Sequence, residues 1–243
     1  VPITELEQPS FCRPKSESLK SRPLAQEWTP AVRWQSIPDE YLHATPEDLD
    51  QRISSARDQL GTRLVILSHH YQRDEIIRFS DFRGDSLELS RRAASRQDTD
   101  YILFCGVHFM AETADVLTQH NQAVILPNLA AGCSMSDMAP NDDVMDCWDI
   151  LNEIVGPEGL VPVTYMNSTA TLKALCGRNG GIACTSSNTP KIFRWAFDRG
   201  KRILFFPDQH LGRNTGIKLG IPLDQMVIWN PFKPQGGLTK DQI

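Results

Sequence analysis

The sequence predicts an α/β fold of two similar three-layer α/β/α domains, each built on a short parallel sheet. Short apolar runs alternate with stretches of helical periodicity, which is typical of βαβ units whose strands are covered on both faces. This pattern occurs twice, about a hundred residues apart, which indicates a duplicated domain rather than a solenoid unit. Three positions match in step between the copies: Ser86 with Ser186, Phe104 with Phe205, and Leu126 with Ile228.

Residues 1–38 carry scattered Pro, Ser, Lys and Glu without periodicity, which predicts an N-terminal arm or tail. The first α/β domain is expected over 39–155. Its first helix should start at Pro46, with Thr45 as N-cap, and end at Gly61. The expected elements that follow are a strand at 64–67, a helix at 86–96, a strand at 101–104, a helix at 110–118 and a strand at 123–126.

The second domain is expected over 156–243, after a junction rich in Gly and Pro. Its expected elements are strands at 161–165, 181–184, 203–206 and 226–229, and helices at 168–176, 189–198 and 213–218. The counterpart of the loop that carries Cys133 would lie beyond Ile243. We therefore expect this domain to be truncated before its cysteine loop.

Composition narrows the class of protein. The 243 residues are 40% hydrophobic and carry a net charge of -5, so nucleic acid is not an expected partner. No apolar stretch approaches the ~20 residues of a membrane span, and the start of the chain lacks the pattern of a signal peptide. The six cysteines show no regular spacing. We expect a cytoplasmic protein with free thiols.

Polar side chains follow nearly every predicted strand. Ligands of open parallel sheets bind at the carboxyl ends of the strands, so these residues predict a site between the two domains. Ser86 and Ser186 are either ordinary N-caps or, because both copies have them, contacts to a shared anionic ligand. His69 and Tyr71 are either an acid/base pair or part of a packed hydrogen-bond cluster.

Cys133 differs from the other cysteines because it lies in a loop after a strand, between Gly132 and Ser134. This setting suits a thiolate ligand or nucleophile, and equally a free surface thiol. Cys105 and Cys184 adjoin apolar runs and are expected in the core. Cys147 is expected on a helix and Cys176 in a turn, and Cys12 lies in the N-terminal arm.

Seven motifs, taken together in this order and spacing, resemble quinolinate synthases, the iron–sulfur enzymes of de novo NAD biosynthesis. They are Ser-His-His-Tyr-Gln from Ser68, Gly-Asp-Ser-Leu-Glu-Leu-Ser-Arg from Gly84, Phe-Cys-Gly-Val-His-Phe-Met-Ala-Glu-Thr-Ala from Phe104, Gly-Cys-Ser-Met from Gly132, Tyr-Met-Asn-Ser-Thr-Ala from Tyr165, Cys-Thr-Ser-Ser-Asn from Cys184, and Pro-Asp-Gln-His-Leu-Gly from Pro207. The resemblance implies three similar α/β domains that share one [4Fe-4S] cluster, with one cysteine from each domain and one open iron.

The implied activity is a transferase reaction that condenses iminoaspartate with dihydroxyacetone phosphate to quinolinate. The open iron would act as a Lewis acid, and L-aspartate oxidase is an implied supplier of iminoaspartate. Cys133 would be the cluster ligand, and Tyr71 and His69 the catalytic acid/base residues. The substrate-binding residues would be His69, Asp85, Ser86, Tyr165, Asn167 and Ser186.

The chain departs from the family in lacking a third domain and the two other cluster cysteines. We therefore expect a fragment, the first two of three domains, that is inactive by itself. Two rival functions stay open. One is a zinc- or iron-dependent hydrolase that uses His69, His70, His108, Glu112 and His210. The other is a non-catalytic module that binds a phosphorylated metabolite through Ser86 and Ser186.

Overall fold

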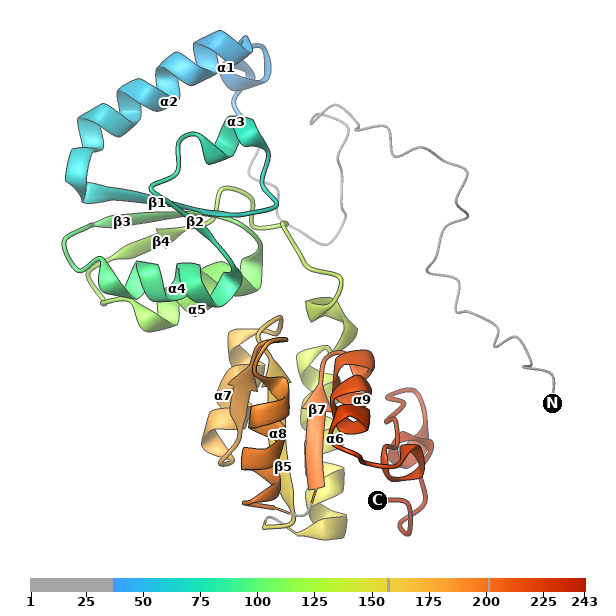
Figure 1. The fold of residues 1–243 in the computed structure, drawn as a ribbon. Coiled ribbons are helices and arrows are strands. Elements are labelled where there is room, and N and C mark those ends of the chain that lie inside the picture. Colours follow the sequence, from blue (N-terminus) through green and yellow to red (C-terminus); the bar gives the residue numbers. More distant parts are fainter. Residues whose placement is uncertain (1–36, 157, 201) are drawn as a thin grey trace. The chain divides into compact units, whose positions relative to one another are not determined.

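The computed structural model describes residues 37–156, 158–200 and 202–243 (Figure 1). The expected N-terminal arm lies almost wholly outside the described residues. The described residues up to Asp50 belong to one compact unit and those from Gln51 to a second. The first contains α1 (Asp39–Leu42) and the first turn of α2 (Pro46–Leu60). The Asp48 N–H donates to the Thr45 hydroxyl at 3.2 Å, so Thr45 caps α2 as predicted.

The second unit begins with a sheet of four parallel strands in the order β2-β1-β3-β4. They are β1 (Leu64–His69), β2 (Phe82–Gly84), β3 (Tyr101–Cys105) and β4 (Ala123–Ile125). Helices α4 (Ser86–Ser95) and α5 (His108–Leu117) pack against one face, where Val65 and Leu67 lie in a core with Phe104. Ile66 and Ser68, which alternate with them, are also buried. Strand β1 is therefore covered on both faces, as its continuous apolar sequence predicts.

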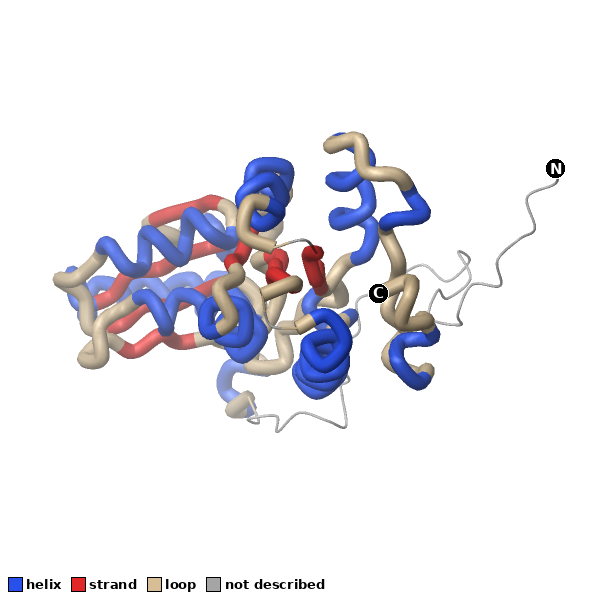
Figure 2. The backbone as a smooth tube through the Cα atoms, turned by 90° about the horizontal axis from the view of Figure 1, so that it is seen from below, coloured by secondary structure: helices blue, strands red, loops and turns tan. Residues whose placement is uncertain are grey.

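The second sheet has three parallel strands in the order β6-β5-β7, which matches β2-β1-β3 in the first. They are β5 (Leu160–Tyr165), β6 (Ile182–Cys184) and β7 (Arg202–Phe206). Alternate β5 residues face different cores: Val161 and Val163 pack with α8 (Thr189–Phe197), and Leu160 packs with α7 (Ala170–Arg178). Figure 2 shows strands flanked by helices in both sheets. The predicted α/β fold with two parallel sheets is confirmed.

Helix α6 (Asn141–Val155) contributes its apolar face to the second sheet's core. Val144, Trp148 and Leu151 pack there with Leu160 of β5. The junction expected near Gly156 lies between α6 and β5, and the domain boundary at 155/156 stays a prediction. The packing of α6 nevertheless links it to the sheet that follows it in the chain.

The strand predicted at 226–229 is wrong: these residues pair with no strand of the described sheets. The segment packs through single side chains instead. Met226 lies against Gly216 of α9 (Gln209–Lys218), and the Trp229 ring lies over Gly236. Val227 and Ile228 between them are largely exposed. The second sheet therefore lacks the equivalent of β4.

The start of α9 differs from its prediction, whereas α4 starts at residue 86 as predicted, and an aspartate caps each of these helices. Asp208 accepts hydrogen bonds from the N–H groups of His210 and Leu211, both at 2.9 Å, so α9 starts at Gln209 and not at 213. Asp85 is the N-cap of α4, which makes Ser86 the first residue of the helix and not its cap.

Short elements had little sequence signal. The structure adds α1, α3 (Asp74–Ile77) and β2, together with four short 3₁₀ or turn segments: Gly61–Arg63, Ser136–Met138, Leu223–Gln225 and Pro234–Gly237. Among the described residues, no helix has the length and apolarity needed to cross a bilayer.

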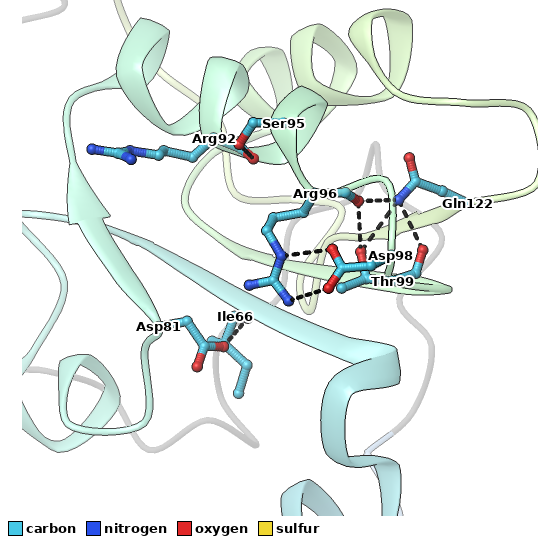
Figure 3. Close-up of polar contacts among 8 residues, drawn as sticks. All are labelled: Ile66, Asp81, Arg92, Ser95, Arg96, Asp98, Thr99 and Gln122. Atoms are coloured by element: carbon cyan, nitrogen blue, oxygen red, sulfur yellow. Dashed lines mark hydrogen bonds and ion pairs between the residues drawn. The ribbon is translucent and has the colours of Figure 1, made fainter.

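The amino-terminal edge of the first sheet is closed by hydrogen bonds between loops (Figure 3). The buried Gln122 amide donates to the carbonyls of Arg96 at 2.6 Å and Thr99 at 2.8 Å. The Arg96 side chain bonds to Asp98 at 2.9 Å. These contacts join the connection before β3 to the connection before β4. Side chains at the amino-terminal edge thus hydrogen-bond to neighbouring loops. The carboxyl edge is the edge at which a ligand can bind.

We expect Gln122→Leu to lower the free energy of unfolding by about 1–3 kcal/mol, because the buried Thr99 carbonyl loses this donor and the Arg96 carbonyl keeps only the Thr99 hydroxyl. Urea denaturation of the 243-residue chain measures the change. Gln119→Leu is the matched control, since the Gln119 side chain is exposed and only its backbone N–H bonds to Gln122. Equal stability of the two variants would contradict the assigned role of Gln122.

Candidate functional site

His69 and Tyr71 lie together at the carboxyl end of β1. His69 is the last residue of the strand and is only 6% exposed. Its ring centroid lies 4.1 Å from that of His70 and 3.9 Å from that of Tyr71. The end of a buried strand thus holds the imidazole, and the turn that follows brings the phenol against it.

His69 is a neutral imidazole with an unused nitrogen. Burial and, to a smaller extent, the neighbouring His70 lower its pKa to about 4, although the charge of Asp85 acts in the opposite direction. Its Nδ1 atom is buried and has no hydrogen-bond partner among the described residues. A buried polar atom without a partner costs free energy, so this nitrogen is suited to meet a ligand atom.

Tyr71 connects this pair to Cys133. Burial raises the pKa of the Tyr71 phenol, and Cys133 raises it further by its charge. The phenol is still 52% exposed. A protonated phenol with one side open can donate a hydrogen bond or a proton to a bound molecule. The structure therefore brings His69, Tyr71 and Cys133 to one edge of the first sheet.

Asp85 and Ser86 follow β2 at the same edge. The Asp85 carboxylate accepts the Glu88 N–H at 2.8 Å and so caps α4. The half-buried Ser86 begins that helix, and its carbonyl accepts the Ser90 hydroxyl at 2.9 Å. The first N–H groups of α4 therefore open at this edge, beside His69.

Cys133 meets a residue of the second copy. The Asn167 side-chain amide donates to the Cys133 sulfur at 3.5 Å. Asn167 follows β5, and Cys133 follows β4 in the first sheet. Tyr165, the last residue of β5, packs against the core of the first sheet as well as that of the second. Residues from the ends of both sheets thus share one neighbourhood.

Ser186 lies at the end of β6, exposed, in the turn that precedes α8. The turn is closed by the Asn188 side chain, which accepts the Thr185 N–H at 2.8 Å. Among the hydrogen bonds of the described residues, none joins Ser186 to the first sheet. The structure therefore places Ser186 on the carboxyl edge of its own sheet, as it does Ser86, without linking the two.

Sequence reasoning missed Lys173 and gave Glu112 a different role. Glu112 is half-buried on α5, and its carboxylate accepts the Ala170 N–H at 3.1 Å, at the start of α7. Lys173 donates from its ammonium to the Ser168 carbonyl at 2.5 Å. His108 does approach Glu112, at 3.8 Å, as expected for one helical turn. These contacts had little sequence signal beyond charged side chains within partly apolar helices.

The other described cysteines are less accessible than Cys133 or differ from their predicted setting. Burial raises the pKa of Cys147 to about 12 and that of Cys184 to about 11. Cys176 was expected in a turn, but it is buried in α7 because it faces the second core. Cys105, expected in the core, is only half-buried. Cys12 lies outside the described residues.

The donor set for a metal is incomplete in this part of the chain. The described residues contain no group of three His, Cys, Asp or Glu side chains that could hold a metal ion. Cys133 offers one sulfur, with an amide donor beside it. A [4Fe-4S] cluster with one open iron needs three thiolates, so the described residues do not by themselves fit a complete cluster.

The chain is similar to known proteins along most of its length. A profile of the family described as quinolinate synthetase A protein matches residues 51–234. A quinolinate synthase of Corynebacterium glutamicum is 57% identical over 213 residues, which cover 88% of this chain and 54% of that protein. One of Streptomyces coelicolor is 53% identical, covering 81% of this chain and 50% of that protein.

A quinolinate synthase of Acidobacterium capsulatum is also 53% identical, over 84% of this chain and 55% of that protein. The chain thus spans about half the length of the curated relatives that it matches. At this level of identity and coverage, the chain belongs to the quinolinate synthetase A protein family.

Proposed function

We propose that this chain forms part of a quinolinate synthase, which condenses iminoaspartate with dihydroxyacetone phosphate to quinolinate, phosphate and water in NAD biosynthesis. The names of the relatives support the product. In this proposal L-aspartate oxidase supplies iminoaspartate, and the protein acts in the cytoplasm. The enzyme belongs to the transferases because it joins two carbon skeletons with loss of phosphate.

The observation that carries the proposal is the meeting of Asn167 with Cys133 at 3.5 Å. This contact joins the carboxyl ends of two parallel sheets, the edge at which such sheets bind ligands. Tyr71 lies close enough to Cys133 for the sulfur to affect its pKa. One ligand at this edge could therefore touch residues of both sheets.

Protonation states suit the proposed roles of His69 and Tyr71. His69 is neutral at physiological pH because of its lowered pKa, so Nδ1 can accept a proton or donate one, depending on the tautomer. Tyr71 keeps its proton and can donate it to a leaving oxygen. We propose these two as the acid/base residues of the dehydration and ring-closure steps.

The remaining residues are proposed as substrate contacts. Ser86 and the first N–H groups of α4 offer hydrogen-bond donors to a carboxylate or phosphate, and Ser186 offers a further hydroxyl. Asn167 and Tyr165 offer an amide and a phenol from the second sheet. Asp85 orients α4 through its cap and, by its charge, favours a cationic or amino group beside His69.

We propose Cys133 as one thiolate ligand of a [4Fe-4S] cluster. Its loop position and the neighbouring Asn167 amide support this role, since amide donors to sulfur are common around such clusters and tune them. The described residues supply one such thiolate, and the cluster, when bound, would supply a Lewis-acid iron.

A chimera tests the function directly. When this chain replaces the matched segment of the C. glutamicum relative, the protein, made without oxygen, should form quinolinate from iminoaspartate and dihydroxyacetone phosphate. Cys133→Ser in the chimera should abolish activity and iron binding, because a hydroxyl is a poor ligand for iron–sulfur clusters. Quinolinate is measured chromatographically, and iron and sulfide by chemical analysis.

Cys184→Ser is the matched control for this experiment, because Cys184 is buried in the second core. It should retain iron and lose only some stability. A folded, inactive chimera with full iron would argue against the proposed substrates. Equal iron loss in both variants, with folding intact, would remove the special role of Cys133.

The isolated 243-residue chain should be colourless and inactive, because the proposed cluster needs three thiolates and Cys133 is the one proposed ligand among the described residues. Anaerobic reconstitution with iron and sulfide, followed by absorbance and iron analysis, provides the measurement. Stoichiometric iron and sulfide on this chain after desalting would show that the proposed ligand set is wrong.

The lowered pKa of His69 predicts a pH dependence of stability. The folded state has the lower pKa, about 4 against the ordinary 6.5, so only the unfolded chain takes up this proton between these values. The free energy of unfolding should therefore fall as the pH drops from about 6.5 towards about 4. His69→Gln should reduce this dependence, as measured by urea denaturation across the range. An NMR titration that gives His69 an ordinary pKa would contradict the burial argument.

A further inference from the structure

A polar joint connects α5 of the first sheet to the start of α7 in the second. The Glu112 carboxylate accepts the N–H of Ala170, the first residue of α7, at 3.1 Å. Thr169 caps the same helix by accepting the Leu172 N–H at 3.3 Å. One orphan N–H of α7 is thus satisfied by its own cap residue and another by a carboxylate from a different domain copy.

Lys173 completes the joint from the α7 side. Its ammonium donates to the Ser168 carbonyl at 2.5 Å and lies 5.3 Å from the centroid of the Phe109 ring on α5. Burial lowers the pKa of Lys173 to about 8, and the charge of Glu112 opposes that shift. The half-buried ammonium is therefore partly withdrawn from water, and a carboxylate and an aromatic ring of α5 lie near it as compensation.

The contacts of Glu112 and Lys173 fix the carboxyl-terminal end of the segment that carries Asn167. This segment, 165–169, runs from the end of β5 to the cap of α7. Met166 within it is buried in the core of the first sheet, and Ser168 is buried and accepts the Lys173 bond through its carbonyl. Asn167, between these two fixed residues, reaches the Cys133 sulfur. The position of its amide thus depends on how α7 is seated against α5.

We propose that Glu112 and Lys173 are positioning residues, which hold segment 165–169 in register with the Cys133 loop by tying α7 to α5. The catalytic part of this inference rests on the proposed function, but the positional part does not. Neither residue is given a contact with substrate. Their effect passes through the backbone of residues 168 and 170 to the amide of Asn167.

Hydrogen exchange of the 243-residue chain tests the positional part. Glu112→Leu removes both the acceptor and the charge, whereas Glu112→Gln keeps an acceptor oxygen. Loss of a hydrogen bond to a charged group should speed exchange in peptides covering 165–172 about tenfold in Glu112→Leu and less in Glu112→Gln. Lys173→Met should act in the same direction, and Lys173→Arg, which keeps a donor, should restore most of the protection.

Asp115→Asn and Lys191→Met are the matched controls, since both side chains are exposed, on α5 and α8 respectively. They should leave exchange over 165–172 unchanged. If Glu112→Leu speeds exchange throughout both sheets, that variant is generally destabilised. The milder variants Glu112→Gln and Lys173→Met then test the local effect. Exchange over 165–172 that equals the controls in those two variants would overturn the proposal.

Steady-state kinetics of the chimera test the catalytic part. Misplacement of Asn167 should lower kcat about tenfold to a hundredfold in Glu112→Leu and Lys173→Met and should raise KM as well, because the displaced amide is itself a proposed substrate contact. Lys173→Arg should recover kcat. An unchanged kcat alongside the local exchange effect would overturn the catalytic part. A wild-type chimera that forms no quinolinate would instead contradict the proposed function and leave the exchange result valid.

Discussion

The parallel pairing of the strands is the constraint on which the rest of the structure depends. Every strand pair in both sheets is parallel, so all carboxyl ends in a sheet lie at the same edge. This geometry puts His69 and Asp85 within electrostatic reach of one another, although α3 and β2 with their loops separate them in sequence. The opposite edge is closed by the buried Gln122 and its backbone partners. The candidate site residues therefore lie at the carboxyl edge of the first sheet, and the stabilising hydrogen bonds of Gln122 lie at its amino-terminal edge.

Contacts between the two sheets bring residues from their two carboxyl edges close together. Met166 enters the first core, Glu112 caps the start of α7, and Asn167 meets Cys133. Each contact uses a residue on the short path from β5 to α7 or its partner on the first sheet. Apolar burial supplies a non-directional force that holds the sheets together, whereas the hydrogen bonds determine the register. Two duplicated units can in this way combine different side chains at one site.

Much of the fold could be predicted because its signals are local. Continuous apolar runs predicted six of the seven strands, and Thr45 and Gly61 marked the ends of α2. The predictions were wrong where neighbours in space overrule the pattern. The run at 226–229 reads as a strand, but Trp229 and Met226 pack separately and leave the backbone unpaired. Strand β2 was missed because Phe-Arg-Gly is too short and too polar to form an apolar run.

For the candidate site, the sequence by itself determined which residues follow the strands, and its motifs determined the family. It could not determine which of these residues meet. The contact between Cys133 and Asn167, the unpartnered nitrogen of His69, and the joint of Glu112 with Lys173 were decided only by tertiary structure. The physical reason is that strand ends follow from local periodicity, whereas contacts between side chains tens of residues apart depend on how whole sheets and helices pack.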